Sequence, residues 1–130
     1  MAYFLLKTEP SDYNLDLLEK SKTAFWDGVA NNLAIKHLKT IQKGDLCFIY
    51  HTGNEKAIVG LAKAISLPKE DEAKGWGVDV SFEKRYSKPI TLSEIKADKN
   101  FEGFDLVRNS RLSVMPVPPP YLEVLLNKYL

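Results

Sequence analysis

The chain has 130 residues, which fits one domain, and its formal net charge is only +1. That balance excludes a bulk electrostatic attraction to nucleic acid or to anionic membranes, so a nucleic-acid role must rest on a local patch and a pocket. Cys47 is the only cysteine, which excludes an internal disulfide and a multi-cysteine zinc site and indicates a reducing compartment.

The N-terminal segment 1–7 has no basic region before its apolar run. The run itself is too short for a signal peptide or a membrane span. We therefore expect a cytoplasmic protein, or a nuclear one if the source is eukaryotic, with no membrane partner.

The first half of the chain predicts one strand and two helices. Tyr3–Leu6 is a short apolar run typical of a buried strand, and Pro10 lies beyond its end. Asn14 can cap a short helix that runs through Glu19. A second helix is expected over 32–42, because its apolar residues recur at i, i+4 and i+7. We expect its basic side chains on a solvated face: Lys36, Lys39 and Lys43.

The second half predicts mostly strands. Leu46–His51 is typical of a central strand, and Ala57–Ile65 of its return strand, with Gly60 as a candidate bulge or close-approach site. Trp76–Tyr86 alternates apolar and polar residues, as a half-buried strand does. The other expectations are a loop at 67–75, a helical turn at 91–95, an ambiguous stretch at 101–107, a last strand at Leu112–Val117, and a closing helix from Pro119 or Pro120 that buries Leu122, Leu125, Leu126 and Tyr129.

Short strands with helices in their connections predict an α+β fold with a curved sheet or a small barrel of five to six strands at its centre. The alternation of strands and helices is too irregular for a doubly wound parallel sheet. No repeat, linker or low-complexity segment divides the chain, so we expect a single domain over residues 1–130.

The segment Phe25–Asn31 stands out because it lies between two helical patterns yet carries two large aromatic residues. Its Asp-Gly pair is a turn signal. Trp26 serves either core packing or the stacking of a flat ligand, and both interpretations stay open. Asn31 can cap the helix that follows or contact a ligand.

The sequence argues against catalysis, metal and cofactor. Its glycines are isolated and form neither a P-loop nor a dinucleotide fingerprint. The two histidines, His37 and His51, lie in different elements, which disfavours a metal site. Ser113 has no nucleophile elbow around it, so a hydrolytic triad is not supported. We therefore expect a non-catalytic protein that binds neither metal nor cofactor.

Binding chemistry is better represented, at the ends of the predicted strands. Strand ends that meet at one mouth form a concave site, where an aromatic ring can stack on a base and hydroxyls or amides can contact its edge. Tyr50 and His51 can equally be packing or edge residues, and Arg111 can equally pair with an internal carboxylate. The four segments are Lys7-Thr8-Glu9-Pro10-Ser11, Trp26 to Asn31, Tyr50-His51-Thr52 and Arg111-Leu112-Ser113.

Several short motifs follow one another in order across nearly the whole chain. They are Lys7-Thr8-Glu9-Pro10, Trp26-Asp27-Gly28-Val29 with Asn31, Gly44-Asp45, Tyr50-His51-Thr52, Ile58-Val59-Gly60, Trp76-Gly77-Val78-Asp79-Val80, and Arg111 to Val117. Together they resemble the EVE domain family, a branch of the PUA-like fold. The chain departs from the family pattern in two places: Ala30 replaces an arginine, and Asn32, Leu33 and Ile35 replace tyrosine, glutamine and arginine.

The resemblance implies a PUA-like β-barrel with short flanking helices and a pocket that reads a modified base, notably modified cytosine, in DNA or RNA. It implies no catalysis. The matching positions give the candidate ligand-binding residues: Lys7, Ser11, Trp26, Asn31, Tyr50, His51, Thr52, Arg111, Leu112 and Ser113.

Three hypotheses follow. In the first, a modified base stacks on Trp26 or Tyr50, while surface cations such as Lys36, Lys39 or Arg108 hold the nucleic-acid backbone. In the second, a small enzyme acts on a nucleotide with His51 as general base. In the third, the chain is a protein-interaction module in which Trp26 and Tyr50 are core residues.

Overall fold

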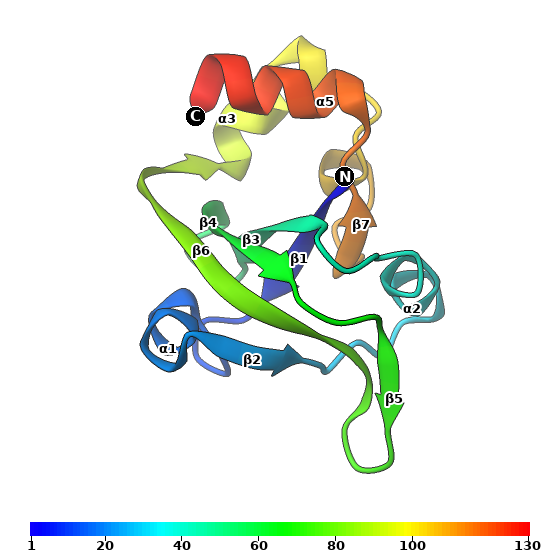
Figure 1. Ribbon diagram of the computed structural model, residues 1–130. Helices are drawn as coiled ribbons and strands as arrows, with labels where there is room; N and C mark the ends of the chain where they lie inside the picture. The colour runs from blue at the N-terminus through cyan, green and yellow to red at the C-terminus, as the bar shows by residue number, and fades with distance from the viewer.

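The computed structural model describes residues 1–130 and shows a mixed α+β protein built on a seven-stranded sheet (Figure 1). The main path of the sheet has the order β2-β6-β4-β3-β1-β7, and β5 pairs with β6 outside this path. β1 runs parallel to β3, and all other pairs are antiparallel. The strands are β1 (Tyr3–Thr8), β2 (Thr23–Trp26), β3 (Leu46–His51), β4 (Ala57–Ala64), β5 (Lys69–Asp71), β6 (Gly75–Thr91) and β7 (Val114–Pro116).

Five α-helices lie in the connections between strands and at the C-terminus. In Figure 1, α3 and α5 lie together at one end of the molecule, α1 lies beside β2, and the hairpin of β5 and β6 projects from the opposite end. No helix combines the length and the apolar character that crossing a membrane requires. The helices are α1 (Leu15–Ser21), α2 (Asn32–Leu38), α3 (Leu92–Ala97), α4 (Asp105–Arg108) and α5 (Pro119–Val124), with a 3-10 turn η1 (Lys99–Phe101) and a π turn η2 (Leu125–Tyr129).

The sheet is curved but it is not closed into the small barrel that we expected. The outer strands β2 and β7 do not pair with each other, so the sheet keeps two edges. Register shifts in β4 on both sides of Gly60 and Leu61 bend the sheet at its centre. A Cβ placed on Gly60 would lie 2.7 Å from a methyl group of Leu15 and 2.7 Å from the carbonyl oxygen of Lys84. Glycine at this position therefore lets α1 pack directly on the bend.

Local capping signals in the sequence give the helix starts that they predict. The Asn14 side chain accepts a hydrogen bond from the Leu17 backbone N–H at 3.0 Å, which begins α1. Thr91 and Glu94 form a reciprocal capping box at the start of α3. The central strands β1, β3 and β4 bury their apolar residues in the main core.

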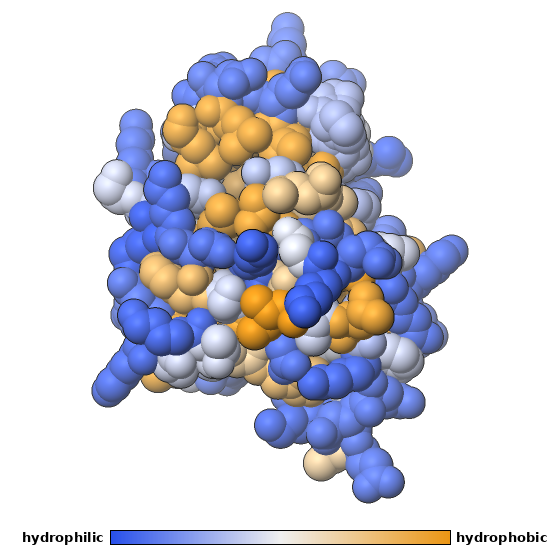
Figure 2. All heavy atoms as spheres, in the orientation of Figure 1, coloured by the Kyte–Doolittle hydropathy of each residue, from blue (hydrophilic) through white to orange (hydrophobic).

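Some predicted boundaries were wrong. The segment Phe25–Asn31, expected as a connection between two helices, begins within strand β2, because β2 pairs with the distant β6. The helix predicted over 32–42 ends at Leu38, since the last residues turn toward β3 while Ile41 stays buried. Leu126 is 41% exposed rather than buried. It lies in η2, next to the α3 and α5 end of the molecule, where Figure 2 shows apolar surface.

Three strand predictions also needed correction. The predicted loop at 67–75 contains the short strand β5, which forms a hairpin with β6. β6 runs past Tyr86 to Thr91, because it pairs with β4 as far as Thr91, after pairing with β5 and β2 in its first part. The last strand is limited to Val114–Pro116.

The C-terminal turn is tied to the loop after α3 by a single carboxylate. Asp98, whose side chain is 7% exposed, accepts hydrogen bonds from Lys128 Nζ at 2.9 Å and from Tyr129 Oη at 2.8 Å. Its other partner is the Asn100 backbone N–H. These donors, led by Lys128, hold the pKa of Asp98 well below its usual range.

We predict that Asp98→Asn lowers the thermal stability at neutral pH and that its difference from the wild type shrinks as the pH falls below about 4. Because the folded state depresses the pKa of Asp98, the stabilisation is present above the unfolded pKa and is lost as the pH falls through the folded one. Thermal unfolding followed by circular dichroism across this range measures the effect. Glu72→Gln, at an exposed carboxylate in the β5–β6 turn, is the control. A constant difference at all pH values contradicts the prediction.

Candidate functional site

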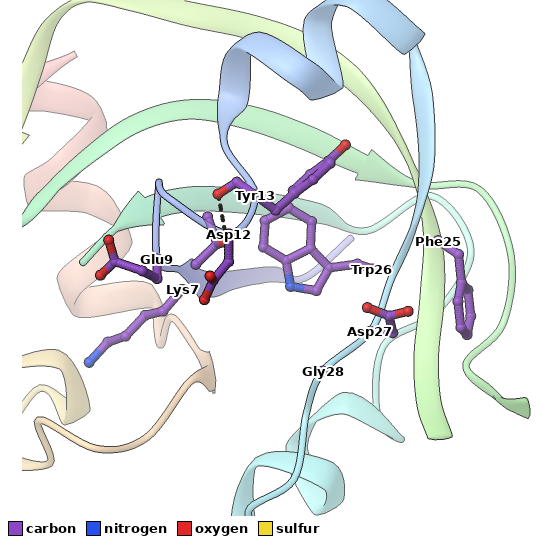
Figure 3. Close-up of a pocket in the computed structure, with 9 residues that line it drawn as sticks. Lys7, Glu9, Asp12, Tyr13, Phe25, Trp26, Asp27 and Gly28 are labelled. Carbon is purple, nitrogen blue, oxygen red and sulfur yellow. Dashed lines mark hydrogen bonds between the residues drawn. The ribbon is translucent and has the colours of Figure 1, made fainter. Parts of the chain in front are cut away.

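A cavity of about 420 Å³ opens between the end of β1 and the end of β2. Two short segments form it. The first continues from β1 into the loop before α1, and the second leaves β2 toward α2 (Figure 3). The lining residues are Lys7, Thr8, Glu9, Asp12, Tyr13, Phe25, Trp26, Asp27 and Gly28.

Trp26 and Tyr13 form the aromatic wall of the cavity. The indole is 6% exposed, and the Tyr13 ring meets it edge to face, with centroids 5.7 Å apart. Burial raises the pKa of the Tyr13 phenol, and its hydroxyl points away from the cavity carboxylates (Figure 3). Phe25 points away from Trp26, as neighbouring residues of a strand do (Figure 3). The aromatic surface available to a ligand is therefore that of Trp26 and Tyr13.

Three carboxylates give the cavity an acceptor-rich edge. In Figure 3, Glu9 lies at the end away from Trp26, Asp27 lies beside Trp26, and Asp12 lies between these ends. Asp12 and Asp27 are exposed and take part in none of the ion pairs of the structure. Their oxygens are therefore free to accept hydrogen bonds from a ligand.

Glu9 is held in place by predicted site residues. Its Oε1 accepts hydrogen bonds from the Ser11 hydroxyl at 3.2 Å and the Ser11 N–H at 3.4 Å. Its Oε2 accepts one from the Thr52 hydroxyl at 3.1 Å. Gly53, at φ +72°, leaves room for this carboxylate, since a Cβ there would lie 2.9 Å from Oε2. The structure thus brings Ser11 and Thr52 to the cavity edge as supports of Glu9.

Lys7 is the only cation that lines the cavity. Its ammonium donates a hydrogen bond to the carbonyl oxygen of Ser110 at 3.1 Å and lies 5.5 Å from the centre of the Tyr50 ring. Burial lowers the pKa of Lys7. Tyr50 itself is 3% exposed, and burial raises its pKa. Tyr50 therefore lies in the interior next to the Lys7 side chain and does not line the cavity.

His51 lies behind the cavity wall. Its Nε2 accepts a hydrogen bond from the Leu15 N–H at 3.1 Å, and its Nδ1 lies 2.7 Å from Oε1 of Glu55. These partners require a neutral ring with the proton on Nδ1. In this tautomer only Nε2 has a lone pair that could accept a proton, and the Leu15 N–H already occupies it. The geometry therefore does not favour His51 as a general base. Its contacts instead fix the start of α1, directly after the wall residues Asp12 and Tyr13.

The remaining predicted residues lie outside the cavity lining. Asn31 caps α2, with its Oδ1 accepting from the N–H groups of Leu33 at 2.9 Å and Ala34 at 3.1 Å.

The fourth predicted segment, Arg111-Leu112-Ser113, lies just before β7. Leu112 is 2% exposed and belongs to the core. The Ser113 carbonyl accepts a hydrogen bond from the Lys7 N–H at 2.9 Å, which joins this segment to β1. Arg111 is exposed. The cavity therefore opens between Trp26 and the 7–13 segment, and the candidate residues Tyr50 and Ser113 do not line it.

Sequence reasoning singled out Lys7 and Trp26 but missed Asp12 and Tyr13. The signal was available, since both residues immediately precede Asn14, the predicted helix cap. A loop between a strand end and a capped helix is a common place for binding residues. No group of three or more His, Cys, Asp or Glu residues is arranged to hold a metal ion.

The fold and the cavity define an α+β protein with an aromatic, acceptor-rich pocket at one end of a curved sheet. Residues 2–128 match the EVE domain family, and the chain belongs to this family. It shares 29% identity with mouse thymocyte nuclear protein 1, over 96% of this chain and 72% of the mouse protein.

Solved structures share the fold. A hypothetical protein from Leishmania major has a TM-score of 0.89 and 30% identity, covering 97% of this chain and 92% of that one. The human THYN1 protein, solved in complex with 5-methylcytosine-containing DNA, has a TM-score of 0.86 and 23% identity, covering 97% of this chain and 96% of that one.

We predict that His51→Leu lowers the free energy of unfolding by about 1–3 kcal/mol, because the buried Leu15 N–H loses its acceptor. Chemical denaturation measures the change. Glu55→Gln is the matched control, since the amide oxygen still accepts from Nδ1 of His51, and it should have a much smaller effect. Equal stability of His51→Leu and the wild type would show that this hydrogen bond does not hold α1 in place.

Proposed function

We propose that this chain is a single nucleic-acid-binding domain that reads a modified base, with a modified cytosine as its ligand, and that it does so without catalysis. The observation that carries the proposal is the buried indole of Trp26 beside unpaired carboxylates in one open cavity. The human THYN1 complex with 5-methylcytosine-containing DNA, which shares this fold, supports the choice of ligand.

The size of the cavity suits one base. Its volume of about 420 Å³ lies at the lower end of the range of ligand sites, roughly 300–1,000 Å³. A base enters such a pocket only if it leaves the stack, either from a single strand or by flipping out of a duplex. The unstacking energy has to be recovered inside the cavity, and an aromatic wall can supply about 1–3 kcal/mol per base.

The polar lining suits a cytosine-type edge. Cytosine presents an exocyclic amino group, and Asp or Glu side chains are its natural acceptors. Asp12 and Asp27 have free oxygens for this purpose, and Glu9 is held at the far end. A 5-methyl group adds apolar area that can lie against Trp26 or Tyr13. Because the carboxylates repel phosphate, the sugar-phosphate backbone stays outside the cavity.

We predict that an oligonucleotide containing 5-methylcytosine quenches Trp26 fluorescence at lower concentration than its unmodified counterpart. Trp76→Phe makes Trp26 the only tryptophan of the chain and provides the reporter. In the chain that retains Trp76, Trp26→Leu should weaken binding by about 1–3 kcal/mol through lost stacking. Labelled oligonucleotides measure that loss by fluorescence anisotropy.

Phe82→Leu is the matched control, because it shortens a half-buried aromatic side chain of β6 that does not line the cavity. It should leave the preference for the modified base intact. Equal quenching by both oligonucleotides would remove base specificity from the proposal. The same two oligonucleotides, made once as DNA and once as RNA, show whether the domain prefers deoxyribose or ribose.

A further inference from the structure

Positive charge is concentrated on one segment next to the cavity. Residues 28–44 contain three lysines and one histidine but no aspartate or glutamate, in a chain whose charges otherwise nearly cancel. The lysines are exposed, and none of them belongs to an ion pair of the structure. The lysines of this segment, Lys36, Lys39 and Lys43, are therefore free to meet an anionic partner.

A second aromatic residue lies at the edge of this segment. The Lys39 ammonium lies 4.5 Å from the centre of the half-buried Trp76 ring, and α2 packs against β6, which carries Trp76. Trp26 pairs with Val78 in the sheet, so Trp76 lies two residues further along β6 on the same face as Val78. The spacing between Val78 and Trp76 along β6 is therefore about 7 Å. Two successive base steps along one nucleic-acid strand, each about 3.4 Å, cover a similar distance.

The contact between Lys39 and Trp76 can be exchanged for contacts with a nucleotide. A cation over an exposed ring contributes only about 0.5–1 kcal/mol. A nucleotide offers the ammonium a phosphate and offers the indole a base to stack on. Both partners can therefore gain when the pair opens around a nucleic-acid strand.

We propose that this α2 surface, formed by Lys36, Lys39, Lys43 and Trp76, binds the strand that flanks the base in the cavity. The lysines contact phosphates, and Trp76 stacks on a flanking base. The proposal rests on the proposed function, because the base held by Trp26 sets the position of the strand. The charges agree with this division, since carboxylates line the cavity and the three lysines lie in the last turn of α2 and just after it.

The first test measures the affinity for a labelled single-stranded oligonucleotide at several salt concentrations. Lys36→Gln and Lys39→Gln should each weaken binding about fivefold at 0.1 M salt and reduce the slope of log K against log salt by about 0.7, the value for one phosphate contact with a single strand. Lys96→Gln is the matched control, because Lys96 is an exposed, unpaired lysine in the last turn of α3, at the other end of the molecule. It should change neither quantity.

The second test uses Trp26→Phe, which leaves Trp76 as the only tryptophan. An oligonucleotide should quench Trp76 fluorescence, whereas a free 5-methylcytidine nucleoside, which has no flanking strand, should not. Unchanged Trp76 fluorescence with bound oligonucleotide, together with lysine variants that behave like Lys96→Gln, overturns the inference.

The two proposals fail in different ways. If the lysine variants lose affinity but modified and unmodified oligonucleotides bind equally, the α2 surface stands and base reading fails. If the preference for the modified base persists while Lys36→Gln and Lys39→Gln match the control, base reading stands and the α2 surface fails.

Discussion

The close approach of α1 to the bend in the sheet is the constraint on which the cavity depends. Gly60 has no side chain, so Leu15 packs directly against β4 at the point where the register shifts. The backbone of the same leucine is held by His51. Because Asp12 and Tyr13 precede Leu15 by only three and two residues, this one anchored residue positions a wall of the cavity.

Sheet curvature explains why two separated strands share a site. β1 and β2 have three other strands between them in the sheet order, yet their ends form the two sides of the cavity. β6 contributes to the bend by pairing with β2 at one end and with β4 along the rest. The result is a pocket that no single hairpin or helix contains, which is typical of sites held by a rigid scaffold rather than by a flexible loop.

Local signals made part of the fold predictable from the sequence. The Asn14 cap, the helical turn at 91–95 and the apolar run of β3 each depend on residues a few positions apart, and each prediction was confirmed. Strand β2 was missed, because four residues carry little periodicity and their partner β6 lies more than fifty residues away in the sequence. The choice between an open curved sheet and a closed barrel could not be predicted for the same reason, since closure depends on long-range pairing.

The candidate site was predictable only in part. Trp26 drew attention because a large aromatic beside an Asp-Gly turn is unusual, and it does line the cavity. Asp12 was missed although it lies just before the Asn14 cap, because its place in the cavity wall follows from the packing of α1 on the sheet. The central claim is that one base enters the cavity, and the most direct measurement is a crystal structure of the chain with a 5-methylcytosine oligonucleotide. The account predicts the methylated base stacked on Trp26 with its amino group facing Asp12 or Asp27. A bound strand whose bases all lie outside this cavity would contradict it.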